Sequence, residues 1–161
     1  RTLDTIQSFT GKPALGWLGP GLTETLDTPD YLAAAGIKYI GDWVHDDEPT
    51  EIKTANGPLI TLPYSMETND IPVMMVQHHE AAYWTQKCID SFDRLYQEGA
   101  ERPKIMAIAI HPYISGQPFR IKYLEQIYEY VNRYSGVLHW NGEQILDWYL
   151  EARQDARQLP R

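Results

Sequence analysis

The sequence has few of the features that mark several large classes of protein. Cys88 is the single cysteine among 161 residues, so no internal disulfide can form and a reducing, cytoplasmic location is expected. No apolar run approaches the roughly 20 residues that a membrane-spanning helix needs, and no signal peptide is visible. Lys and Arg number 14 against 22 Asp and Glu, giving a net charge of -8 without a basic stripe. These absences argue against membrane and nucleic acid as partners.

Common catalytic and metal-binding motifs are also missing. The sequence has no Gly-x-Ser-x-Gly elbow, no phosphate-binding loop and no dinucleotide fingerprint. His78-His79-Glu80 lacks the i, i+3 or i, i+4 spacing of helical metal ligands, because adjacent side chains point to different sides of a helix. Cys88 lies among apolar residues of a predicted helix, which is typical of a core position. We therefore expect no metal site within this chain.

Short apolar segments alternate with amphipathic ones along the chain, in the order expected of an α/β domain with a parallel sheet. The segment 103–110 is apolar on both faces, as strands covered by helices on both sides require. One domain is expected for a chain of this length. Strands are predicted at 14–18, 37–40, 59–62, 103–110 and 137–140, helices at 28–35, 80–97, 118–134 and from 141, and a helix end near 3–9. The long segments 41–58 and 63–77 are predicted to be loops, and long loops are usually functional.

Active sites of parallel α/β folds form at the carboxyl ends of the strands. The residues expected there are Gly16-Trp17, Asp42-Trp43, Pro63-Tyr64 and His111-Pro112. His111 directly follows an apolar strand and precedes a proline, so its imidazole has a fixed position from which to protonate a leaving amine or hold an oxyanion. The alternative is a buried histidine whose hydrogen bonds go to the backbone.

Acidic side chains offer two further interpretations. Asp42 can orient His111 or stabilise its charged form, and we expect Asp42, Trp43 and His111 to lie together; alternatively, Asp42 only caps its own loop. Asp46, Asp47 and Glu48 are cation-ligand types, but carboxylates adjacent in sequence do not converge without a special turn. A solvated loop is the favoured interpretation of that trio.

Five strings of the sequence together resemble the polysaccharide deacetylase (NodB-homology) family, in particular its branch of cofactor-independent allantoinases. The strings are GWLGPGLTETLDTPDYLAAAGIKYIGDW, DDEP, LPY, ND and IAIHPYISGQPFR, and the resemblance extends from about Leu3 to Tyr149. It implies a distorted (β/α) barrel and a hydrolase of non-peptide carbon–nitrogen bonds, which deacetylates N-acetyl sugars or opens a small cyclic amide.

The resemblance also implies roles for individual residues. His111-Pro112 matches the family's fifth motif, with His111 as the acid, while Gly16-Trp17 and Asp42-Trp43 match the third and fourth motifs. Asp42 is the second catalytic candidate. The implied substrate-binding residues are Gly16, Trp17, Trp43, Asp46, Asp47, Tyr64, Asn69, Asp70 and Pro112. The Arg-x-Pro-Tyr form of the third motif is absent, which argues against a polysaccharide substrate.

The family's first two motifs, which supply the general base and the metal ligands, are absent from the sequence. The chain therefore resembles only the carboxyl-terminal half of the barrel, and its start at Arg1 rather than Met suggests a missing segment. A divalent metal such as zinc would then be held by the missing half. Because half a barrel leaves open sheet edges, we expect that half or a second copy of this chain as partner. The alternative function is a non-catalytic carbohydrate- or small-ligand-binding fragment in which Trp17, Trp43 and Tyr64 stack on the ligand. A further alternative is an assembly protein that keeps the fold without the chemistry.

Overall fold

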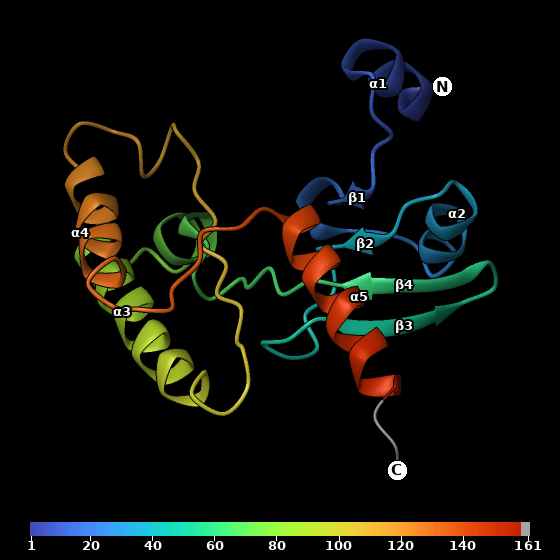
Figure 1. Ribbon diagram of the computed structural model, residues 1–161. Coiled ribbons are helices and arrows are strands. Elements are labelled where there is room, and N and C mark those ends of the chain that lie inside the picture. Colours follow the sequence, from blue (N-terminus) through green and yellow to red (C-terminus); the bar gives the residue numbers. More distant parts are fainter. Residues whose placement is uncertain (159–161) are drawn as a thin grey trace. The chain divides into compact units, whose positions relative to one another are not determined.

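The computed structural model describes residues 1–158, which form two compact units (Figure 1). The first, called the sheet unit, contains Arg1–Leu62 and the carboxyl-terminal segment from Trp140; the second, called the helical unit, is Pro63–His139. Each unit has its own cluster of buried apolar side chains. Within residues 1–158, no helix combines the length and the apolar character needed to cross a bilayer.

The sheet unit contains a four-stranded sheet in the order β1-β2-β4-β3. β1, β2 and β4 run parallel, and β3 pairs antiparallel with β4. The strands are β1 (Gly16–Trp17), β2 (Tyr39–Ile40), β3 (Thr50–Thr54) and β4 (Gly57–Thr61), and the helices are α1 (Thr2–Thr10), the short η1 turn (Pro20–Leu22), α2 (Thr28–Ala34) and α5 (Gly142–Gln158). The parallel strands and flanking helices confirm the predicted α/β class.

Helices cover both faces of this sheet. Successive side chains of a strand point to opposite faces, so Leu59 and Ile60 of β4 mark the two sides. Leu59 is buried with Leu32 of α2, whereas Ile60 is buried with Leu146 of α5. Figure 1 shows α5 lying across the sheet. The near-continuous apolar character of the inner strands follows from burial on both faces.

The ends of these helices follow from local sequence signals. Gly36 adopts a positive φ of 91°, and the Ile37 N–H donates to the Leu32 carbonyl, which ends α2 and turns the chain toward β2. Asn141 and Gln144 exchange side-chain-to-backbone hydrogen bonds and so cap the start of α5, where a helix was predicted. Thr28 is the first residue of α2, and its side-chain oxygen accepts a hydrogen bond from the Thr25 N–H.

The helical unit contains a six-residue π-helix, η2 (Ile71–Val76), and two α-helices, α3 (Ala81–Glu98) and α4 (Ile121–Val131). Apolar side chains from all three, together with Ile114, form its core. Trp84 of α3 is fully buried, and its indole N–H donates to the Thr68 carbonyl at 2.9 Å. This bond connects α3 to the segment that leads into η2.

Part of the predicted loop 41–58 is a strand, so that prediction was wrong over its second half. Residues 50–54 form β3, which makes a hairpin with β4 through Ala55 and Asn56. The polar residues of β3 occur because alternate side chains of this edge strand are exposed. The Asn56-Gly57 pair was the available turn signal, with Gly57 at a positive φ of 106°.

The predicted strands at 103–110 and 137–140 were also wrong, because neither segment pairs with a strand in the described residues. Within 103–110, the Ala107 carbonyl accepts from the Thr68 hydroxyl and the Ala109 carbonyl accepts from the Asp70 N–H. An apolar pattern predicts burial of a segment but cannot supply the neighbouring strand that a parallel ladder requires.

Candidate active site

Asp70 and His111 form the best-defined polar arrangement of the helical unit. Asp70 Oδ1 lies 2.6 Å from His111 Nδ1, and Asp70 Oδ2 accepts the His111 backbone N–H at 2.7 Å. Asp70 is completely buried, whereas 30% of the His111 side chain is exposed. The carboxylate therefore holds both the ring and the backbone of a histidine that solvent can reach.

Ser115 completes the surroundings of Asp70. Its buried hydroxyl donates to Asp70 Oδ2 at 2.7 Å. Since Asp70 lies between the two, Ser115 bonds the carboxylate rather than the imidazole. A serine nucleophile needs its hydroxyl on the imidazole, so this is not a Ser-His-Asp triad. Ser115 instead helps to fix the carboxylate.

Two chain segments bring these groups together. Asp70 is held by its N–H bond to Ala109, and the Asn69 side chain accepts the Ile71 N–H at the start of η2. On the other segment, the backbone turns directly after His111, because the Ile114 and Ser115 N–H groups both donate to the His111 carbonyl. This turn places Ser115 so that its hydroxyl reaches the Asp70 carboxylate.

The geometry fixes which ring nitrogen can react. A carboxylate only accepts hydrogen bonds, so Nδ1 carries the hydrogen shared with Asp70. Nε2 is then the nitrogen that can exchange a proton with a substrate. Tyr64 belongs to the same unit, and its pKa is raised by burial and by the negative charge of Asp70. The Tyr113 ring lies edge-on to His111, with centroids 5.7 Å apart.

The predicted site residues of the sheet unit have different surroundings. Asp42 follows β2, and its Oδ1 accepts the Gly19 N–H at 2.6 Å. Trp17 and Trp43 are half-buried and pack against the core formed by Leu32, Ile37, Ile40 and Leu59. The ring orientation of His111 that we expected of Asp42 is supplied by Asp70. The grouping of Asp42 and Trp43 with His111 stays a prediction, since these residues belong to different units.

Gly16, Asp46 and Asp47 have simple structural explanations. A Cβ at Gly16 would overlap the Tyr39 ring, so this packing alone accounts for the glycine. Asp46 and Asp47 are exposed, and Asp46 Oδ1 accepts the Asp47 backbone N–H. That turn is local and agrees with the solvated-loop interpretation. A role for any of the three in substrate binding stays a prediction.

The structure resembles known carbon–nitrogen hydrolases. No family model matches the sequence. A peptidoglycan deacetylase from Helicobacter pylori is 26% identical over 186 residues, covering 94% of this chain and 62% of that protein. The Puue allantoinase crystal structure superposes with a TM-score of 0.82 at 28% identity, covering 90% of this chain and 49% of that one. A probable polysaccharide deacetylase from Pseudomonas aeruginosa PAO1 gives a TM-score of 0.80 at 28% identity, covering 99% and 52%.

The chain has the polysaccharide deacetylase fold. It spans about half to three fifths of the length of these relatives. The resemblance stated from the sequence is therefore confirmed, both for the deacetylases and for the allantoinase. The chain covers only about half of each matched structure, which agrees with the expectation of a partial barrel.

The described residues do not form a metal centre by themselves, and a metal held by residues outside this chain stays a prediction. Among residues 1–158, no three His, Cys, Asp or Glu side chains converge in a way that would hold a metal ion. His79 stacks on the Tyr83 ring with centroids 4.0 Å apart, and Cys88 is buried, which raises the pKa of its thiol to about 12.

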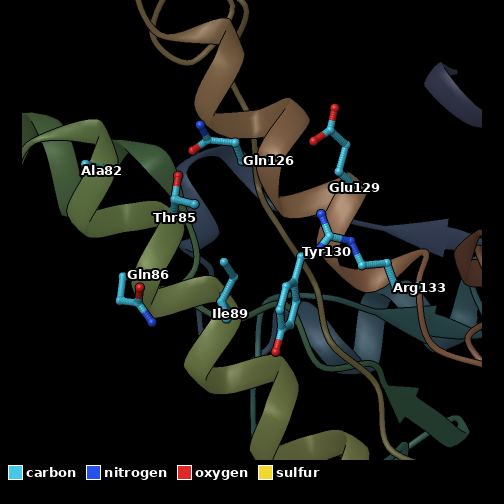
Figure 2. A pocket seen from close by; sticks show the side chains of 8 residues that line it. All are labelled: Ala82, Thr85, Gln86, Ile89, Gln126, Glu129, Tyr130 and Arg133. Carbon is cyan, nitrogen blue, oxygen red and sulfur yellow. The ribbon is translucent and has the colours of Figure 1, made fainter.

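A separate groove lies between α3 and α4 (Figure 2). It has a cavity volume of about 340 Å³, and its lining residues are Ala82, Thr85, Gln86, Ile89, Gln126, Glu129, Tyr130 and Arg133. None of the predicted site residues lines it. The candidate catalytic groups of the helical unit, Asp70 and His111, therefore lie outside this groove.

Proposed function

We propose that the complete protein hydrolyses a carbon–nitrogen bond other than a peptide bond and that His111 is its general acid. The observation that carries this proposal is the bond from His111 Nδ1 to the buried Asp70 carboxylate. It is supported by the sequence similarity to a peptidoglycan deacetylase and by the structural similarity to an allantoinase, each over most of this chain.

The proposed step is a proton transfer. Asp70 fixes the ring and stabilises its positive charge, so the imidazolium can donate its Nε2 proton to the nitrogen of the breaking carbon–nitrogen bond. The nitrogen leaves as a neutral amine, and His111 becomes neutral. The proton of the attacking water is taken by a general base, which we assign to the half of the barrel outside this chain.

The substrate class is an acetamido sugar or a small cyclic amide. Trp17 and Trp43 at the ends of β1 and β2 offer flat surfaces for a sugar ring or a planar ureide. The absence of the Arg-x-Pro-Tyr form favours the small amide. Asp42, Asn69 and Tyr64 are proposed as polar contacts that select among these substrates.

The experiment is product analysis with the complete protein, including the segment that supplies the base. Acetate release from N-acetylated glycans and peptidoglycan is measured in parallel with ring opening of allantoin and related cyclic amides. Turnover of either class supports the proposal. Binding of a substrate without turnover of any would favour the alternative of a non-catalytic binding fragment.

We assign the amino-terminal half of the barrel, or a second copy of this chain, as its partner, since the relatives are about twice its length. We also propose a cytoplasmic location, which is supported by the single, buried Cys88.

A further inference from the structure

Glu24 and Asp42 of the sheet unit form a pair of acidic side chains whose carboxyl groups interact directly. Asp42 Oδ1 accepts the Gly19 N–H. The other three oxygens, both of Glu24 and Oδ2 of Asp42, are buried and have no hydrogen-bond donor among the described residues. Buried polar oxygens are rarely left without a donor.

One proton on Glu24 is the simplest way to give Asp42 Oδ2 a donor, although the second Glu24 oxygen then still has no donor among the described residues. Two ionised carboxylates offer only acceptors, so they repel each other and leave the buried oxygens unsatisfied. One proton on Glu24 removes the repulsion and lets its hydroxyl donate to Asp42. In agreement, the pKa of Glu24 is raised by burial, then by the charge of Asp42 and by the hydrogen bond to it.

Gly19 makes room for this arrangement. A Cβ on Gly19 would lie 2.9 Å from Asp42 Oδ2 and 3.2 Å from Oδ1, closer than ordinary packing allows. The Asp42 carboxylate therefore contacts both the backbone of Gly19 and the Glu24 side chain. Its position depends on both contacts.

We propose that Glu24 and Asp42 hold one proton between them and that protonated Glu24 is the positioning residue for the Asp42 carboxylate at the end of β2. The functional part of this inference rests on the proposed function, in which Asp42 contacts the substrate. The protonation itself does not, since it follows from contacts within the sheet unit.

The test is thermal unfolding of the complete protein at pH values from below the usual carboxyl pKa to above neutrality. Between the unfolded and the raised folded pKa of Glu24, the unfolded chain has lost the proton that the folded protein still binds. Stability therefore falls as pH rises through that window. In the Glu24→Gln variant the amide keeps a donor but cannot ionise. Its midpoint should match the parent at low pH and exceed it increasingly as pH rises.

Glu151→Gln is the matched control, because Glu151 is exposed on α5. It should shift the midpoint equally at every pH. A constant difference between Glu24→Gln and the parent would overturn the proposal. So would stabilisation of the parent, but not of Glu24→Gln, by Ca²⁺, Mg²⁺ or Zn²⁺, because the oxygens would then bind a cation instead.

Turnover tests the positioning role separately. Glu24→Ala should lower turnover, and Glu24→Gln should restore it toward the parent value, because only the latter keeps the donor. Equal loss in both variants would contradict positioning by a neutral group. If the complete protein turns over none of the substrates, the pH dependence of unfolding still decides the shared proton.

Discussion

At the scale of single residues, Asp70 has the most demanding surroundings in the helical unit. A carboxylate without exposed surface is costly unless donors surround it. Asp70 has three: the His111 ring, the His111 backbone and the Ser115 hydroxyl. Because these donors leave little freedom to the carboxylate, Asp70 fits the role of a positioning residue better than the substrate contact implied by the family resemblance.

Gly16 provides a test of packing in the sheet unit. Gly16→Ala should destabilise the protein by about 1–3 kcal/mol, because the added methyl group would overlap the Tyr39 ring. Chemical denaturation measures the change. The same substitution in a Tyr39→Ala background should cost clearly less, and equal costs in both backgrounds would contradict this explanation of the glycine.

The sequence pointed to His111 as a candidate catalytic residue but not to the carboxylate that contacts it. His111 was identified from its place after an apolar segment and before Pro112, a local pattern. Asp42 was expected as its partner because it also follows a strand. That Asp70 takes this role depends on residues 68–70 folding back onto 107–111, and no spacing in the sequence indicates that contact. Ser115 and Glu24 were missed for the same reason.

At the scale of elements, the cap of α5 is a local feature with a measurable contribution. Asn141→Ala removes the side-chain acceptor for the Gln144 N–H and should lower stability by about 0.5–2 kcal/mol. Denaturant titration of this variant is compared with Glu151→Ala, an exposed substitution on the same helix that should change stability by less than about 0.5 kcal/mol. Equal effects would show that the cap is not a significant contact.

Helices were predicted more accurately than strands for a physical reason. The backbone hydrogen bonds that form α2, α3 and α4 lie within each segment, so the amphipathic spacing of each segment was a sufficient signal. A strand needs a partner elsewhere in the chain. The sequence pattern therefore predicts a loop where β3 forms. It also predicts a strand at the apolar segment 103–110, which has no strand partner in the described residues.

At the scale of the whole molecule, the half-length match to the relatives predicts association. Ile110 and Leu138 are exposed, and both lie in segments expected to be strands but without strand pairing here. An apolar, unpaired edge favours pairing with another chain. In sedimentation at micromolar concentration, the isolated chain should form dimers or larger species. A monomer of 18.6 kDa with a cooperative thermal transition would contradict the partial-barrel account.

Turnover by the complete protein tests the proposed roles of His111 and Asp70 most directly. His111→Ala should lower kcat by roughly 10²–10⁴-fold while the variant stays folded, because the leaving nitrogen loses its acid. Asp70→Asn should lower it within the same range, since an amide no longer fixes the ring with its hydrogen on Nδ1. His139→Ala, which changes an exposed histidine bonded to Asn132, should leave kcat unchanged. A well-folded His111→Ala variant with kcat within a few-fold of the parent would show that His111 is only structural.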